Sequence, residues 1–202
     1  MFHLCTQHKY VVPENQIMPI GCYSLVPYVA HHVAIHRPER VLDLGIGLGS
    51  YGSVVRQWGD LGERPWRTYL IGVEAWASYR NPMWDLYNAV AGCSIQEFLS
   101  EQSGRFDLVL LTDVIEHFER HEGQTILEQL KQEIVAPGGS LFVGTPGIFC
   151  EQGAVGGNEW ERHRSLWLAN DFAGQGFRVI LDGSPDEFGN QMVLAEWKNL
   201  RT

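Results

Sequence analysis

Residues 41–52 read VLDLGIGLGSYG, an apolar run that passes directly into a glycine-rich turn. The run is apolar except for Asp43, as expected of a strand buried on both faces of a sheet. From Gly47 to Trp58 the apolar residues change to helical spacing. Glycines between the two elements let backbone amides come close to a ligand. The stretch therefore predicts a strand, a tight turn and a helix, with room for a ligand at the turn.

The rest of the chain alternates between apolar runs and helical patterns in the same way. The segment 122–135 has helical spacing and ends before Pro137-Gly138-Gly139, which stops a helix. Alternation of strand and helix is typical of parallel βαβ units, so it predicts an α/β fold with a doubly wound sheet and helices on both faces. The further strands are expected at 68–74, 106–113 and 140–145.

Two apolar runs near the end of the sequence, 177–183 and 190–197, are separated by a short link rich in Gly, Pro and Asp. Such a link cannot hold a crossover helix. We therefore expect these two strands to be antiparallel neighbours at one edge of the sheet.

Composition indicates a single domain covering residues 1–202, because 45% of the residues are apolar and no repeat or linker interrupts the chain. The formal net charge is −9, from 15 Lys and Arg against 24 Asp and Glu, which disfavours binding to DNA or long RNA. No stretch reaches the ~18 apolar residues of a membrane span, and the first residues do not resemble a signal peptide. We expect a cytoplasmic, soluble protein with neither a nucleic-acid nor a membrane partner.

The cysteines are widely spaced and form no CxxC pair. This spacing argues against a zinc ribbon and against a thioredoxin-like site. Free thiols, as in cytosolic proteins, are the expectation for Cys5, Cys22, Cys93 and Cys150.

The glycine-rich turn indicates a ligand that carries a ribose. Gly47-x-Gly49-x-x-Gly52 matches the dinucleotide-binding fingerprint, and Glu74 ends the next strand, where an acid can hold ribose hydroxyls. Asp43, however, lies at the end of the first strand, where its charge opposes a pyrophosphate and suits an ammonium group. This acid favours S-adenosylmethionine over NAD as the ligand.

At these positions the sequence resembles the class I S-adenosylmethionine-dependent methyltransferases. VLDLGIGLG (41–49) is similar to the first motif of the family, Val73-Glu74 to its acidic second strand end, and FDLVLLTDVIEH (106–117) to its fourth strand. The resemblance runs from about residue 25 to residue 197. It implies a Rossmann-like, seven-stranded sheet that is mostly parallel with an antiparallel last strand.

The resemblance also implies a cofactor site. The glycines would lie against the methionine portion of the cofactor, Asp43 would hold its amino group, Glu74 the ribose and Trp76 the adenine. Many relatives have an Asp after the third strand that binds the adenine amine, whereas this chain has Cys93-Ser94-Ile95 there. The expected cofactor-binding residues are Asp43, Gly45, Gly47, Gly49, Glu74, Ala75, Trp76, Ser94, Ile95 and Asp113.

Two histidines are the candidate catalytic residues, because transfer of a methyl group to a hydroxyl needs a base. His117 follows the fourth strand at the expected ligand crevice, and His163 lies in an aromatic and polar insert. Each could instead have a purely structural role. Together with Asp113 and Glu116 they also resemble the divalent-metal set of small-RNA 2′-O-methyltransferases and ubiquinone-pathway O-methyltransferases.

The expected activity is O-methylation of a small molecule, such as a sugar or a secondary metabolite. Within the single domain, residues 1–38 would form a lid and a covering helix, and 146–167 an insert over the active site. Two alternatives remain: an NAD-dependent oxidoreductase or epimerase, against which the lack of a Tyr-x-x-x-Lys pair argues, and a non-catalytic S-adenosylmethionine-binding scaffold. The sequence does not determine whether the protein forms a homodimer.

Overall fold

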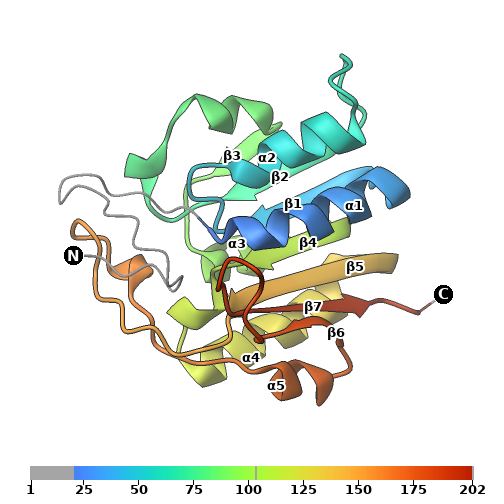
Figure 1. The fold of residues 1–202 in the computed structure, drawn as a ribbon. Coiled ribbons are helices and arrows are strands. Elements are labelled where there is room, and N and C mark those ends of the chain that lie inside the picture. Colours follow the sequence, from blue (N-terminus) through green and yellow to red (C-terminus); the bar gives the residue numbers. More distant parts are fainter. Residues whose placement is uncertain (1–20, 103, 202) are drawn as a thin grey trace.

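The computed structural model describes residues 21–102 and 104–201, and these contain a seven-stranded sheet with the order β3-β2-β1-β4-β5-β7-β6 (Figure 1). The pairs β1–β2, β1–β4, β2–β3 and β4–β5 are parallel, whereas β7 is antiparallel to both β5 and β6. The predicted doubly wound, Rossmann-like sheet is confirmed. Its strands are β1 (Arg40–Leu44), β2 (Tyr69–Val73), β3 (Ala89–Ala91), β4 (Phe106–Thr112), β5 (Val135–Pro146), β6 (Arg178–Asp182) and β7 (Met192–Lys198).

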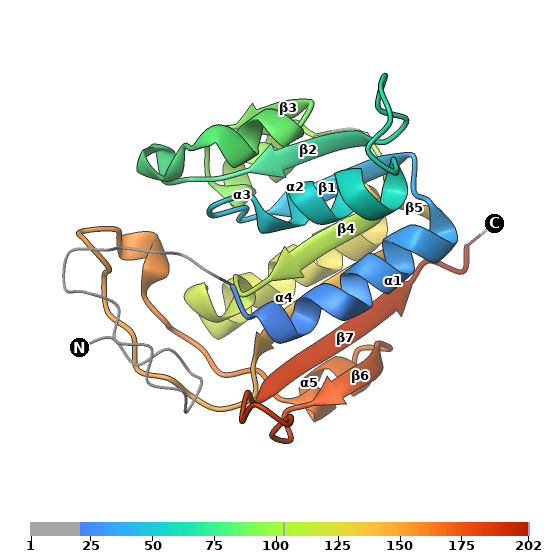
Figure 2. The same ribbon diagram turned by 45° about the horizontal axis from the view of Figure 1, so that its top comes forward.

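Helices cover both faces of the sheet, as the alternating pattern predicts (Figure 2). On one face α1 and α2 pack against Leu108 and Leu110 of β4, and on the other face α3, α4 and α5 share a core with Val109 and Leu111. Successive residues of this strand therefore serve opposite cores. The helices are α1 (Val26–His36), α2 (Ser50–Val54, continued as a π-helix by Val55–Gly59), α3 (Ile95–Glu101), α4 (Arg120–Gln129, continued as a π-helix by Leu130–Ile134) and α5 (Ala169–Ala173).

Short 3-10 helices connect the larger elements and lie mostly at the carboxyl ends of the parallel strands. They are Tyr23–Leu25 before α1, Ala77–Tyr79 and Pro82–Leu86 between β2 and β3, Ile115–His117 after β4, and Glu159–Glu161 after β5. The N-terminal lid expected within residues 1–38 falls largely on 1–20, which lie outside the described residues.

The structure differs from two of the sequence-based expectations and confirms a third. Strand β5 begins at Val135 and runs through Pro137-Gly138-Gly139, with an irregular register opposite Phe106 and Leu108. Strands β6 and β7 are antiparallel neighbours at one edge of the sheet, as predicted, with β7 beside β5. Cys22 and Cys93 are free thiols, as expected, but Cys150 is disulfide-bonded.

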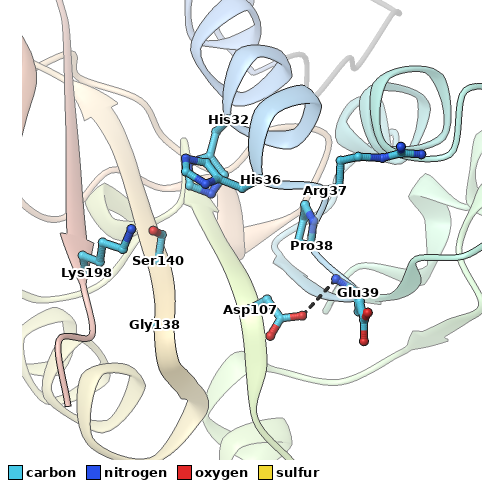
Figure 3. Close-up of a pocket in the computed structure, with 9 residues that line it drawn as sticks. All are labelled: His32, His36, Arg37, Pro38, Glu39, Asp107, Gly138, Ser140 and Lys198. Atoms are coloured by element: carbon cyan, nitrogen blue, oxygen red, sulfur yellow. Dashed lines mark hydrogen bonds between the residues drawn. The ribbon is translucent and has the colours of Figure 1, made fainter. Parts of the chain in front are cut away.

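A pocket of about 360 Å³ opens at the end of the sheet where β1 and β4 begin (Figure 3). His32 and His36 of α1 face it from one side and Lys198 of β7 from another, while Asp107 accepts a hydrogen bond from the backbone N–H of Glu39 at 2.9 Å. The pocket is thus at the opposite end of β1 from the glycine-rich turn. No helix within the described residues is long and apolar enough to cross a membrane.

The contact between α4 and the segment that leads into α5 is tight enough to require a glycine. A Cβ atom at Gly123 would lie 2.6 Å from Cζ2 of Trp167, which is fully buried, and 3.2 Å from Ile115. Helix propensity alone predicts that Gly123→Ala stabilises the protein by about 1 kcal/mol.

We expect Gly123→Ala to lower the free energy of unfolding by about 1–3 kcal/mol, because overpacking at Trp167 exceeds the gain in helix propensity. Urea unfolding followed by circular dichroism measures the change. Gln124→Ala, at the exposed neighbouring position of α4, is the control and should change stability by less than about 0.5 kcal/mol. A stabilised Gly123→Ala variant would contradict the packing described.

Candidate functional site

The glycine-rich turn follows β1 at the carboxyl end of the sheet. Gly45, Gly47 and Gly49 have φ angles of 73°, 50° and 87°, in the left-handed region that favours glycine. The backbone N–H groups of Gly45 and Ile46 donate to the carbonyl oxygen of Val73 at 2.9 and 3.1 Å. The turn is therefore fastened to the end of β2, at the crevice where doubly wound sheets bind their ligands.

Glu74 continues from β2 into this crevice. Its carboxylate accepts hydrogen bonds from the backbone N–H groups of Gly47 at 2.8 Å and of Trp76 at 2.9 Å. Burial raises its pKa, and these N–H groups oppose that rise. A carboxylate has about four lone-pair sites, so two bonds leave acceptor capacity for hydroxyl donors such as those of a ribose.

Asp43 is almost completely buried, with 1% of its surface exposed. Its Oδ2 accepts a hydrogen bond of 2.6 Å from the hydroxyl of Tyr87. Burial raises the pKa of Asp43 to about 7, the charge of Glu74 adds to the rise, and the Tyr87 hydrogen bond opposes it. A nearby cation stabilises the ionised form of a buried carboxylate, so Asp43 is suited to bind an ammonium group.

The remaining candidates for cofactor binding lie around the same edge. Ala75 and Trp76 are partly buried next to Glu74. Ser94 is the N-cap of α3 and forms a capping box with Glu97, so its hydroxyl has a structural task. Ile95, the first residue of α3, is buried in the core. A role for these residues toward an adenine ring stays a prediction.

Asp113 directly follows β4 and has a φ angle of 54°, which is unusual for a residue other than glycine. Its Oδ2 accepts a hydrogen bond of 2.7 Å from the backbone N–H of Cys22. Burial raises its pKa to about 6, and the Cys22 N–H opposes this rise. Asp113 therefore ties the segment before α1 to the carboxyl end of β4.

The two candidate catalytic histidines lie together, although 46 positions separate them in the sequence. The ring centroids of His117 and His163 are 4.9 Å apart. Nδ1 of His117 is 3.3 Å from the carbonyl oxygen of Arg162, and Nδ1 of His163 is 2.7 Å from that of Cys150. Burial, followed by the proximity of His163, lowers the pKa of His117 to about 4, and burial also lowers that of His163. Both imidazoles are therefore neutral near pH 7.

Glu116 completes a cluster with these histidines. It is buried, and its carboxylate accepts a hydrogen bond of 3.0 Å from the hydroxyl of Thr145. Burial and the charge of Asp113 raise its pKa well above the usual value. One ligand atom from each of Glu116, His117 and His163 lies within 4.8 Å of the others, so three of the four predicted metal-ligating residues come together in the described part of the chain; Asp113 is not in this group.

The insert 146–167 is held against two elements of the site. The backbone N–H groups of Arg164 and Ser165 donate to the carbonyl oxygen of Glu116 at 2.8 and 3.1 Å. At its other side, Glu161 accepts a hydrogen bond of 2.8 Å from the hydroxyl of Tyr79, which follows β2. The insert therefore spans from the carboxyl end of β4 to that of β2.

The structure adds site residues that the sequence patterns did not reveal. Asn81, Trp84 and Tyr87, in the irregular segment between β2 and β3, hydrogen-bond to the glycine-rich turn or to Asp43. The only signal in the sequence was the high aromatic content of 76–90, which does not indicate a contact with residues 33 or more positions away.

Comparisons with known proteins identify the family. A family model described as a methyltransferase domain matches residues 24–199, so the chain belongs to this family. It is a class I S-adenosylmethionine-dependent methyltransferase, and the NAD-dependent alternative is thereby disfavoured. No curated protein matches the chain in sequence.

Solved structures show the same fold at low sequence identity. The N-methyltransferase NodS from Bradyrhizobium japonicum WM9 is 13% identical, with a TM-score of 0.58 and coverage of 88% of this chain and 94% of NodS. A 1,6-didemethyltoxoflavin-N1-methyltransferase from Burkholderia thailandensis, with bound 1,6-didemethyltoxoflavin and S-adenosylhomocysteine, is 18% identical (TM-score 0.59, coverage 88% and 79%). An O-methyltransferase family protein from the same organism is 16% identical (TM-score 0.60, coverage 87% and 55%). Both N- and O-methyltransferases thus share this fold.

Gly45 tests how tightly the turn is built. A Cβ atom there would lie 2.4 Å from Cγ2 of Val114, and the φ angle of 73° disfavours any other residue. We expect Gly45→Ala to lower the free energy of unfolding by about 2–4 kcal/mol, from the clash and the backbone strain together.

The double variant Gly45→Ala/Val114→Ala separates the two causes. It removes the clash with Val114 but keeps the backbone strain at position 45. The free energy of unfolding of the double variant should therefore be about 1–2 kcal/mol higher than the sum of the two single-variant effects predicts. Urea unfolding of the four proteins gives this coupling energy. Strict additivity would show that Val114 does not contact the turn.

Proposed function

We propose that the protein transfers the methyl group of S-adenosylmethionine to a hydroxyl oxygen of a small-molecule acceptor, such as a sugar or a secondary metabolite. The pair of neutral imidazoles of His117 and His163 at the carboxyl end of β4 is the observation that supports this most. A hydroxyl keeps its proton at neutral pH, so its methylation needs a proton acceptor. The acidic net charge of −9 supports a small acceptor over a nucleic acid.

The residues of the turn have separate tasks in this mechanism. Asp43 receives the ammonium group of the cofactor, Glu74 accepts hydrogen bonds from the ribose hydroxyls, and the glycines leave space for the chain between them. These residues would hold the cofactor in one orientation, as an in-line displacement of its methyl group requires. As the oxygen–carbon bond forms, the sulfur–carbon bond breaks, and the hydroxyl proton moves to a nitrogen of His117 or His163.

The same cluster suits a divalent cation as a second way to activate the hydroxyl. A carboxylate from Glu116 with two imidazoles is a mixed oxygen and nitrogen set, which Mn²⁺, Fe²⁺ or Zn²⁺ accepts more readily than Mg²⁺ does. Such a cation, when bound, lowers the pKa of an oxygen that contacts it. The low pKa values of the histidines keep both rings available as ligands.

The transfer of methyl label to a panel of acceptors tests the reaction class. We expect protein incubated with methyl-labelled S-adenosylmethionine to label oxygen in sugars, phenols or catechols, because the imidazole pair can take up a hydroxyl proton. Mass spectrometry of the products locates the methyl group. Labelling of amines alone, with none on hydroxyls, would contradict the proposed O-methylation.

Alanine variants of the histidines test the proton acceptor. We expect His117→Ala and His163→Ala to lower kcat by about 10²–10⁴-fold while the Kd for S-adenosylhomocysteine stays unchanged, because general bases contribute factors of this size. His121→Ala, exposed at the start of α4, is the matched control.

Calorimetric titration of Mn²⁺ into chelator-treated protein distinguishes the two modes of activation. Binding that His163→Ala abolishes supports the cation, whereas no binding together with full activity after chelation supports the histidines alone. Unchanged kcat in both histidine variants would contradict either role.

A further inference from the structure

The irregular segment between β2 and β3 contacts the glycine-rich turn through two polar side chains. Nδ2 of Asn81 donates to the carbonyl oxygen of Leu48 at 3.1 Å, and Nε1 of Trp84 donates to that of Gly47 at 2.9 Å. Trp84 is buried in the core that the turn shares with α1 and α2. Two consecutive carbonyl groups of the turn are thus held by side chains from one short segment.

Tyr87, at the end of the same segment, joins both ends of the turn. Its hydroxyl donates to Oδ2 of Asp43 at 2.6 Å and accepts a hydrogen bond of 3.0 Å from the backbone N–H of Gly52. Asp43 belongs to β1 and Gly52 to α2. A single phenol group therefore fixes the distance between the last part of the strand and the start of the helix.

The ring of Tyr87 fits only because three glycines surround it. A Cβ atom would lie 3.3 Å from the ring at Gly49, 2.5 Å at Gly52 and 2.9 Å at Gly72. Gly72 is the next-to-last residue of β2, and a glycine inside a strand weakens it and often marks a close approach. The third glycine of the fingerprint motif is thereby explained by the tyrosine beside it.

The surroundings of Asp43 make this hydrogen bond important for its charge. Among the described residues, the titratable groups that face Asp43 are Tyr87, Glu74 directly after β2 and Tyr51 from α2. Glu74 disfavours the ionised form of Asp43, and Tyr51, whose pKa is raised by burial, stays a neutral phenol. The Tyr87 hydroxyl is the group that stabilises the carboxylate before a ligand arrives.

We propose that Tyr87 is a positioning residue of the cofactor site, which holds Asp43 as the carboxylate that receives the ammonium group of S-adenosylmethionine. Trp84 and Asn81 act with it by fixing the shape of the glycine-rich turn. This inference rests on the role that Proposed function gives to Asp43. It assigns a task in cofactor selection to a segment that the family motifs do not include.

The test compares the binding of two ligands to Tyr87→Phe by calorimetry between pH 5.5 and pH 8.5. S-adenosylmethionine carries the ammonium group and a charged sulfonium, whereas 5′-methylthioadenosine keeps the adenosine with an uncharged thioether sulfur and lacks the amino-acid portion. We expect Tyr87→Phe to lower the affinity for S-adenosylmethionine about tenfold at pH 7 and that for 5′-methylthioadenosine much less. The variant loses the hydrogen bond that stabilises the charge of Asp43, and only S-adenosylmethionine has an ammonium group that binds this charge.

The pH dependence of the affinity for S-adenosylmethionine would not change if Tyr87 had only a structural role. A cation selects ionised Asp43, so the affinity for S-adenosylmethionine should fall as the pH drops through about 7. Removal of the hydroxyl removes a contact that lowers the pKa of Asp43, so the midpoint should move to higher pH in Tyr87→Phe. The profile of 5′-methylthioadenosine, which retains the ribose, accounts for the titration of Glu74.

Three further variants make the outcomes distinguishable. Trp84→Phe should lower the affinity for both ligands by about three- to tenfold without moving the midpoint of the pH profile. Tyr69 is a half-exposed tyrosine at the other end of β2, so Tyr69→Phe should change neither the affinities nor the midpoint. If Asp43→Asn leaves the affinity for S-adenosylmethionine intact, the role of Asp43 itself fails. If Asp43→Asn weakens binding but Tyr87→Phe alters neither affinity nor midpoint, the inference about Tyr87 is overturned while the role of Asp43 stands.

Discussion

A negative charge buried in the middle of the sheet, at Asp43, constrains the structure around it. Its strand neighbours in register are Gly72 of β2 and Leu110 of β4, and neither can solvate a carboxylate. Burying a charged group without partners costs several kcal/mol, so the fold must supply a donor from elsewhere. Tyr87 reaches Asp43 across the face of β2, and it can do so because Gly72 has no side chain.

The titratable side chains described at the carboxyl edge of the sheet include several acids and two neutral imidazoles. Over β1 and β2 lie Asp43 and Glu74, both acids whose ionised forms are strengthened by a cation. Over β4 and β5 lie Asp113 and Glu116, whose pKa values are raised by burial, and two imidazoles whose pKa values are lowered by burial. A sulfonium cofactor is attracted by the first half of the edge and is not repelled by the second, because neutral histidines carry no positive charge near it. The two halves are therefore electrostatically compatible with one cationic ligand between them.

The sequence predicts those parts of the fold that local patterns determine. The strands at 106–112 and 69–73 and the turn after Leu44 follow from apolar runs and glycines, and the structure confirms them. Strand β3 has only three residues, too few to show a periodic pattern. Which of the last two strands pairs with β5 is decided by contacts between distant residues, so no local pattern predicts that it is β7.

The same limit applies to the site. Asp43, the glycines and Glu74 are predictable as a site because the motif places them at strand ends. The pairing of His117 with His163 was predicted only as part of a resemblance. The contact of Tyr87 with Asp43 spans 44 positions, and Tyr87 ends the irregular segment after β2, which has no periodicity from which to predict its partner.

Strand β7 determines which side chains lie at the carboxyl edge of the sheet next to β5. Because β7 begins opposite Pro146, the loop that precedes it ends at the carboxyl edge of β5, where Gly147 donates to the carbonyl oxygen of Gln191 at 2.7 Å. This loop brings Phe188 into an edge-to-face contact with Tyr23, with ring centroids 6.1 Å apart. Both rings are about half exposed, as is Phe149 after β5. Beyond the histidines the edge thus offers exposed aromatic rings that a ligand could contact, next to Asp186, whose carboxylate accepts hydrogen bonds from the backbone N–H groups of Phe188 and Asn190 in the same loop.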